Sequence, residues 1–422
     1  LLIGIMSCVG LIALKRPFHK VMTGTLKPIL GYLMLAAGAG VIVSNLDPLG
    51  KMIEHGFHIT GVVPNNEAIV AVAQKVLGVE TMSILVVGLL MNLCIARFTK
   101  FKYVFLTGHH SLFMACLMSA VLGTAGLSGM ELILVGGFLM GAWSAISPAI
   151  GQSYTSKVTD GDEIAIGHFG SLGYYLSAWV AQYVGKAEDS TEDIEIPEKW
   201  GFLRDSTLST ALTMIVFYLI AAIAAGSEFV STLSGDMSPY LYAVMSAMNF
   251  AVGVTIVYSG VRMILGDLIP AFQGIATKII PNAIPAVDCA VFFTYAPTAV
   301  VLGFLSSFIG GIIGMLILGA VGGVLIIPGL VPHFFCGATA GIYGNATGGR
   351  RGAAVGAFLN GLAITFLPAM ALPVLGQLGF QNTTFGDADF AVMGLVLGNA
   401  YEWVGMAGIY GIVAIAALVL II

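Results

Sequence analysis

The chain has 422 residues, of which 58% are hydrophobic and only 9% are Asp, Glu, Lys or Arg. A soluble globule of this length needs more polar surface, so the composition excludes a soluble protein and indicates an integral membrane protein. The net charge of −5 comes without a basic tract, which argues against nucleic-acid binding. We therefore expect an all-α integral membrane protein that has the lipid bilayer as its surroundings.

Apolar stretches of about 20 residues are the unit of a membrane-spanning helix, and they follow one another along the chain. The hydrophilic segment 186–205 is rich in acidic residues and predicts a loop between two halves, followed by a bridging helix at about 208–225. The pattern then continues to the end of the chain, so we expect ten to twelve spans. In the first half the predicted helices cover 1–14, 23–45, 79–96, 103–122, a stretch ending near 149, and 164–184.

Two acidic motifs recur at a fixed spacing. Pro64-Asn65-Asn66-Glu67-Ala68 and Pro285-Ala286-Val287-Asp288-Cys289 lie 221 positions apart, and Gly108 and Gly329 keep the same distance. Asp162 and Asp387 lie nearly as far apart. The chain is therefore predicted to contain two copies of one unit, residues 1–205 and 206–422. Because proline disfavours helix around it, each motif predicts an interrupted or re-entrant segment, the first at 64–77.

The basic loops of the two copies are exchanged. Lys and Arg cluster at 15–20 and 97–102, whereas the equivalent loops of the second copy carry none and its next loop ends in Arg350-Arg351. Cytoplasmic loops hold the excess of Lys and Arg, so the copies should cross the membrane in opposite senses. Inverted repeats are typical of transporters that bind substrate near the midplane. The alternative is a set of diverged helices with chance glycine and proline matches.

Ionisable side chains inside apolar sequence are the candidate site residues. His109, His110 and His168 are imidazoles in apolar surroundings, and Glu67 and Asp288 are the carboxylates of the two repeated motifs. Such groups are costly in a membrane unless they face a cavity or a partner, which favours a functional site. The alternatives are hydrogen bonds between helices for the histidines and structural ion pairs for the acids, with Arg262 as the nearest suitable partner.

Several kinds of chemistry lack their motif in this sequence. The five cysteines form no CxxC pair and no HExxH motif is present, so we expect no metal site and no disulfide. No glycine-rich stretch ends in Gly-Lys-Ser or Gly-Lys-Thr, which argues against an ATP-driven pump. We expect no cofactor.

Four motifs follow one another over nearly the whole chain: Asn66-Glu67-Ala68, Leu106-Thr107-Gly108-His109-His110, Ile166-Gly167-His168, and Val287-Asp288-Cys289-Ala290 through Tyr295-Ala296-Pro297. Together they resemble the membrane-embedded IIC component of the bacterial ascorbate-specific phosphotransferase system. The resemblance implies about eleven transmembrane helices with re-entrant or broken segments, two inverted repeats, a core domain and a V-shaped dimerisation domain. It also implies a homodimer in the bacterial cytoplasmic (inner) membrane.

By this resemblance the chain would carry L-ascorbate or a similar sugar acid inward, while a cytoplasmic IIB partner transfers a phosphoryl group from its own phosphocysteine. None of the cysteines of this chain would carry the phosphoryl group. Relatives have Thr-Tyr in place of Asn66-Glu67 and glutamine in place of Phe113 and Phe169, which removes two amides from the ligand's surroundings. The substrate-binding residues implied are Asn66, Glu67, His109, His110, Phe113, His168, Phe169 and Asp288.

The implied roles follow from the side-chain types. His109 and His168 would donate hydrogen bonds to the anionic ligand, Asp288 would accept from its hydroxyls, and Phe113 and Phe169 would cover its ring. Asp288 is the candidate base for the hydroxyl that receives the phosphoryl group, so an enzymatic role stays open.

Two other function classes remain open from the sequence. An ion-coupled secondary transporter of an organic anion would use Glu67, Asp288 and the histidines as a proton or cation site. A membrane scaffold would bind no transported ligand.

Overall fold

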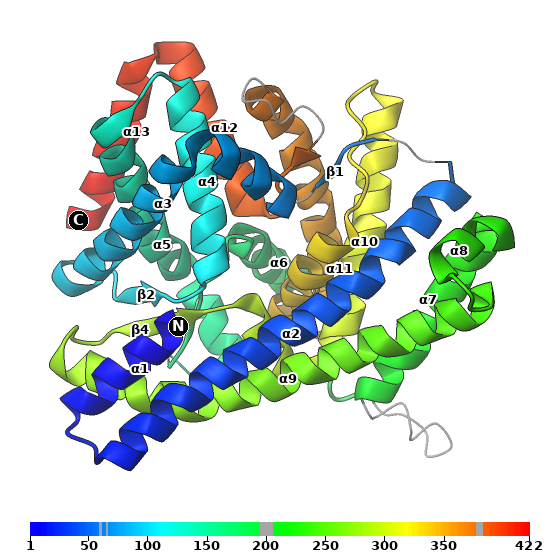
Figure 1. The fold of residues 1–422 in the computed structure, drawn as a ribbon, viewed down its shortest axis with the longest axis horizontal. Coiled ribbons are helices and arrows are strands. Elements are labelled where there is room, and N and C mark those ends of the chain that lie inside the picture. The colour runs from blue at the N-terminus through cyan, green and yellow to red at the C-terminus, as the bar shows by residue number, and fades with distance from the viewer. Residues whose placement is uncertain (59–60, 65, 162, 195–205, 377–382) are drawn as a thin grey trace.

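The computed structural model describes the chain except residues 59–60, 65, 162, 195–205 and 377–382 (Figure 1). The side chains of 67–76, 206, 209, 265, 273, 374–376 and 383 also lie outside the description. Helices make up most of the molecule, as expected for an all-α membrane protein, and five short strands lie between them.

Five helices form one layer of the molecule, which we call the long-helix layer. Its two longest members, α2 (Phe18–Gly56) and α9 (Pro239–Lys278), lie side by side along one edge of the view in Figure 1. They are joined by α1 (Leu2–Ala13), α7 (Ser206–Ala225) and α8 (Ser227–Ser234). The bridging helix predicted at about 208–225 is thus confirmed as α7.

The remaining elements form the main body, which packs against the long-helix layer. Its central contacts are those of α10 and α6 with α11, and of α3 with α5. The helical elements of the main body are α3 (Asn66–Phe98), α4 (Gly108–Thr124), α5 (Gly129–Thr159), α6 (Ser171–Val184), the 3-10 helix η2 (Cys289–Thr294), α10 (Pro297–Ala320), α11 (Leu330–Gly376), α12 (Ala388–Val404) and α13 (Met406–Ile421).

Six helices among the described residues are long and apolar enough to cross a membrane, or seven if the bent pair α7 and α8 counts as one span. The finer count of about eleven spans stays a prediction. The six are Phe18–Gly56, Leu77–Phe98, Gly129–Thr159, Pro239–Lys278, Pro297–Ala320 and Leu330–Pro373.

Several of the predicted helix boundaries are wrong. The helix expected to end near 149 continues to Thr159, and the one expected at 164–184 begins only at Ser171. The helix expected at 23–45 runs from Phe18 to Gly56, because the chain continues in helical form through Pro48 and Lys51 pairs with Asp47 one turn away, at 2.9 Å. The helix expected from 103 begins only at Gly108, after a strand. The predicted interruption at 64–77 has its counterpart at Leu77, where α3 departs from helical geometry.

Five short strands pair in parallel between distant parts of the chain. β4 (Ile284–Val287) lies between β2 (Tyr103–Phe105) and β3 (Ala165–Ile166), and β1 (Val63–Pro64) pairs with β5 (Thr383–Thr384). Pairing satisfies backbone groups that the helices leave free, which is a requirement inside a membrane-embedded body. The sequence analysis did not predict these strands.

Close approach of backbones holds α2 against α9. A Cβ atom on Gly260 of α9 would lie 2.6 Å from the carbonyl oxygen of Gly31 on α2, and one on Gly38 would lie 2.8 Å from the carbonyl oxygen of Gly253. Small residues at such positions allow membrane helices to pack closely. The long-helix layer therefore depends on glycine along this seam.

A matched pair of substitutions on α9 tests this packing. Gly260→Leu should lower the thermal unfolding midpoint of the detergent-solubilised protein, because overpacking at a backbone contact costs about 1–3 kcal/mol. Gly266→Leu is the control, since a Cβ atom there has no neighbour within 4 Å. Equal unfolding midpoints for the two variants would contradict the close glycine packing of α2 against α9.

Candidate functional site

The sheet β2-β4-β3 brings three of the predicted site regions together. His109 and His110 open α4 just after β2, His168 follows β3, and Asp288 follows β4. Because the three strands are parallel neighbours, their carboxyl ends meet at one edge. Gly167 permits this arrangement, since a Cβ atom there would lie 2.4 Å from the carbonyl oxygen of Ala286.

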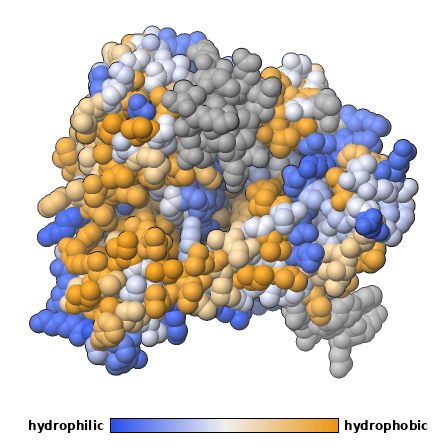
Figure 2. Space-filling model, in the orientation of Figure 1, coloured by the Kyte–Doolittle hydropathy of each residue, from blue (hydrophilic) through white to orange (hydrophobic). Residues whose placement is uncertain are grey.

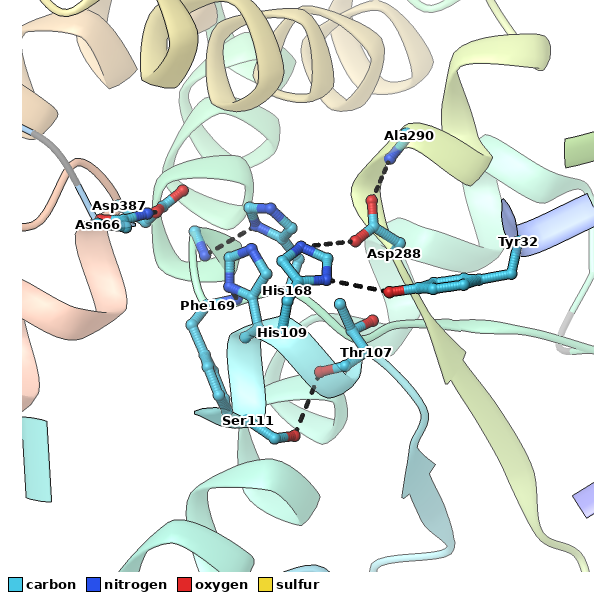
Figure 3. A network of polar contacts seen from close by, with 12 residues as sticks. Tyr32, Asn66, Thr107, His109, Ser111, His168, Phe169, Asp288, Ala290 and Asp387 are labelled. Atoms are coloured by element: carbon cyan, nitrogen blue, oxygen red, sulfur yellow. Dashed lines mark hydrogen bonds and ion pairs between the residues drawn. The ribbon is translucent and has the colours of Figure 1, made fainter. Parts of the chain in front are cut away.

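The sheet β1-β5 supplies the opposite side of the site. Asn66 follows β1 and Asp387 follows β5, and the Asn66 side-chain amide donates a hydrogen bond to Asp387 Oδ2 at 2.5 Å. The Gly386 N–H in turn donates to Asn66 Oδ1 at 2.9 Å. Figure 3 shows this pair on one side of His168 and His109, with Asp288 and Tyr32 on the other.

Asp387 is a site residue that the sequence analysis missed. It lines the same cavity as the histidines and Asp288. The signal was available, because Asp387 is an acidic residue at the start of an apolar helix and keeps the repeat spacing with Asp162.

Asp288 is paired with a histidine rather than with a lysine or an arginine. Its Oδ2 lies 3.4 Å from His109 Nε2, and its Oδ1 accepts a hydrogen bond from the Ala290 N–H at 3.0 Å, which fixes the carboxylate at the start of η2. The suggestion that Arg262 is its partner is therefore wrong. Asp288 Oδ2 is buried and has no hydrogen-bond partner in the part of the chain that the structure describes. It is an acceptor available to a ligand.

Backbone donors set the tautomers of the other two histidines. The Phe169 N–H donates to His110 Nδ1 at 3.2 Å, and the Gly170 N–H donates to His168 Nδ1 at 3.1 Å. An amide N–H can only donate, so each Nδ1 carries a lone pair and each neutral ring carries its hydrogen on Nε2. The two rings lie with centroids 3.7 Å apart and line the cavity. The site therefore holds two oriented N–H donors.

A metal ion suits this arrangement poorly. His110, His168 and Asp387 offer ligand atoms within 4.8 Å of one another. A histidine that ligates a metal through one nitrogen carries its hydrogen on the other, where it donates to an acceptor. In this site the Nδ1 atoms accept hydrogen bonds instead, so metal binding through Nε2 would break both. The group fits a ligand with oxygen acceptors better than a cation.

The two phenylalanines are placed differently from each other. Phe113 lines the cavity, and its ring centroid lies 5.8 Å from that of His109. Phe169 is fully buried, stacks on Phe105 at 4.6 Å and lies behind His110, so its own ring does not line the cavity. The expected cover of the ligand ring thus falls to Phe113, whereas Phe169 acts through its backbone N–H.

Glu67 lies in α3, but its side chain is outside the described residues. Its predicted approach to Asp288 therefore stays a prediction.

The site is the polar end of a cavity of about 1250 Å³. From this end the cavity extends along α2, past Leu35 and Val43, toward Lys51 and Glu54, with Met315 of α10 on another side. Figure 2 shows hydrophilic residues at the centre of this face, bordered by hydrophobic surface. The polar groups are therefore confined to the inner end and to the far end of α2.

Comparison with known proteins places the chain in a family. Residues 1–389 match the family of the PTS system sugar-specific permease component. The chain belongs to this family. The permease is also 26% identical to the ascorbate-specific PTS system EIIC component of Mycoplasma pneumoniae, over 464 aligned positions that cover 95% of this chain and 69% of that relative. The resemblance identified in the sequence is thus confirmed.

Membership of this family implies a membrane protein, which agrees with the long apolar helices. The permease is a multi-pass protein of the bacterial inner membrane, with several apolar spans. Its family implies a sugar as substrate and a cytoplasmic IIB protein as partner.

A second carboxylate next to the site has a structural role. Asp389 is fully buried and accepts hydrogen bonds from Ser171 Oγ at 2.8 Å, from the Leu172 N–H at 2.9 Å and from Trp143 Nε1 at 3.3 Å. Its own N–H donates to the Phe169 carbonyl oxygen at 2.9 Å. Asp389 therefore ties α12 to α5 and α6 directly behind the histidines of the permease.

The contrast between the two neighbouring carboxylates can be measured. Asp389→Ala should lower the thermal unfolding midpoint of the permease, because each buried donor left unpaired costs about 1–3 kcal/mol. Asp387→Ala should lower it less, because water in the cavity can replace the carboxylate at Asn66. A larger loss for Asp387→Ala would contradict this division of roles.

Proposed function

We propose that this permease binds L-ascorbate or a closely similar sugar acid and moves it inward, while a cytoplasmic IIB partner phosphorylates it. One observation carries the proposal: two oriented N–H donors, at His110 and His168, line the same cavity as Asp288. Asp288 Oδ2 has a long contact with His109, at 3.4 Å, but makes no hydrogen bond among the described residues. A sugar acid offers both anionic oxygens for the donors and hydroxyls for the acceptor. The ascorbate-specific relative supports the choice of ligand.

The phosphoryl transfer would need little chemistry from the permease. The ligand hydroxyl attacks phosphorus, a new O–P bond forms, the S–P bond of the IIB phosphocysteine breaks, and the hydroxyl proton leaves. Asp288 Oδ2 is a fixed acceptor for that proton, since Ala290 holds its other oxygen. The contribution of the permease is then mainly to position the hydroxyl.

The proposed architecture is a pair of inverted repeats, residues 1–205 and 206–422. The order of elements supports it. In the first copy a strand, β1, is followed by the helix α3, the strand β2 and the helices α4 and α5. In the second copy the strand β4 is followed by the helices η2 and α10, the bridge at Ile326 and the long helix α11. The strand pairing is also reciprocal: β4 pairs with β2 and β3, whereas β1 pairs with β5 and its neighbour Val62 pairs with Ile326.

The main body corresponds in this proposal to the core domain, and the long-helix layer to the V-shaped dimerisation domain of a homodimer.

The basic residues assign a direction to the cavity. Lys15, Arg16 and Lys20 stand at the start of α2, which places that end at the cytoplasmic face. The cavity follows the other half of α2, toward Lys51 and Glu54. We infer that the structure represents the state in which the site is open to the outside.

Reconstitution separates the two transport mechanisms. Vesicles with the purified permease should accumulate phosphorylated ascorbate only when IIB and a phosphoryl source are present, because phosphorylation traps the ligand as a more highly charged product. Labelled ascorbate and its phosphate would be separated and counted. Concentrative uptake of unmodified ascorbate driven by a proton or sodium gradient alone would instead establish the ion-coupled transporter. A scaffold would show no saturable binding.

Two substitutions test the site itself. Asp288→Asn and His168→Ala should each weaken ascorbate binding by about 10-fold or more, since a hydrogen bond to a charged group contributes about 1.5–3 kcal/mol. Isothermal titration calorimetry on the purified permease measures this. His55→Ala is the control, because His55 lies outside the cavity and stacks on Phe229. Unchanged affinity in both site variants, with folding intact, would rule out the site.

A further inference from the structure

A tyrosine from the long-helix layer reaches into the site of the main body. Tyr32 lies on α2, lines the cavity, and places its hydroxyl oxygen 3.4 Å from His109 Nδ1. The other nitrogen of that ring, Nε2, lies 3.4 Å from Asp288 Oδ2. Figure 3 shows His109 between the two residues. The imidazole therefore connects the two parts of the molecule.

This contact decides which nitrogen of His109 carries the hydrogen. A neutral imidazole has one N–H, and Asp288 offers only an acceptor to Nε2. The arrangement that suits all three groups has the Tyr32 O–H donating to Nδ1 and the Nε2–H pointing toward Asp288 Oδ2. At 3.4 Å this is a long contact, which leaves Asp288 Oδ2 able to accept a hydrogen bond from a ligand. Unlike His110 and His168, His109 has no backbone N–H at its Nδ1 within the described hydrogen bonds, so the tyrosine takes that place.

We propose that Tyr32 is a positioning residue for His109, supplied to the ligand site by the long-helix layer. The proposal rests on the proposed function of this site. Among the side-chain hydrogen bonds of the described residues, this is the one that joins α2 to the site's histidines and carboxylates. The site is thus complete only in the relative arrangement of layer and main body seen in the structure.

The consequence concerns ligand release. Transport by alternating access moves one part of a permease against the other around the bound ligand. Any such displacement separates Tyr32 from His109, because the two residues belong to different parts. His109 then loses the donor that directs its Nε2–H toward Asp288, and the carboxylate that accepts from the ligand is held less firmly. Tyr32 therefore makes ligand affinity depend on the conformational state.

Tyr32→Phe tests the proposal, because it removes the hydroxyl and keeps the ring. The dissociation constant for L-ascorbate should rise about threefold to tenfold, the range of one neutral hydrogen bond. In the His109→Ala background the same change should have less than about a twofold effect, as a double-mutant cycle requires for coupled residues. Tyr218→Phe is the control, since that tyrosine lies in the same layer and donates to the Asn45 carbonyl oxygen instead.

A spectroscopic measurement tests the tautomer without any ligand. In the permease labelled with ¹⁵N-histidine, the signals of His109, assigned by their loss in His109→Ala, should report hydrogen on Nε2, and Tyr32→Phe should shift them. Tyr218→Phe should leave them unchanged. This readout also decides the matter if His109→Ala binds ascorbate too weakly for the cycle.

The outcomes of the two measurements are distinct. Unchanged His109 signals and unchanged affinity in Tyr32→Phe would overturn the positioning role, as would an equal loss of affinity with and without His109. Absence of ascorbate binding by the unmodified permease would refute the proposed function instead, and the ¹⁵N signals would still test Tyr32.

Discussion

The site depends on the parallel pairing of short extended segments from distant parts of the chain. Inside a membrane-embedded body, backbone that is not helical must find its hydrogen bonds within the protein. β4 finds them between β2 and β3, and β1 finds them with β5. Because a polar site residue follows each strand within four positions, this pairing also gathers His109, His168 and Asp288 on one side and Asn66 with Asp387 on the other. The hydrogen bonds that non-helical backbone needs inside the membrane-embedded body thus also bring the site residues together.

The carboxylates around this centre differ in how completely they are hydrogen-bonded. Asp389 has three donors and is closed to the cavity. Asp387 is held by Asn66 and Cys336. Asp288 Oδ2 has a 3.4 Å contact with His109 but no hydrogen bond within the part of the chain that the structure describes. A buried acceptor without a partner is costly, so its retention beside a cavity points to a ligand that supplies the missing donor. The hydrogen-bond partners of each acid thus indicate its role: Asp389 stabilises the fold, and Asp288 is available to a ligand.

Sequence patterns predicted the membrane class, the bridging helix and most of the residues that line the polar inner end of the cavity, because buried histidines and carboxylates are rare in apolar sequence and therefore conspicuous. They did not predict the strands, since segments of two to four residues show no periodicity. Sequence patterns also did not predict the direction of the Phe169 side chain, because packing on Phe105 sets it. Asp387 was visible as an acidic residue, yet its place in the site depends on the pairing of β1 with β5.

The placement of oriented polar groups at the inner end of the cavity bears on specificity. Phe113 offers no hydrogen bond, so the polar groups at the inner end of the cavity are those of the histidines, Asp288 and the Asp387 pair. The histidine tautomers are held by backbone donors and cannot adapt to a ligand that offers a donor in place of an acceptor. Such a ligand leaves two buried N–H groups unpaired, at about 1–3 kcal/mol each. Rejection of the wrong sugar then follows from unsatisfied donors rather than from the fit of a large and mostly apolar cavity.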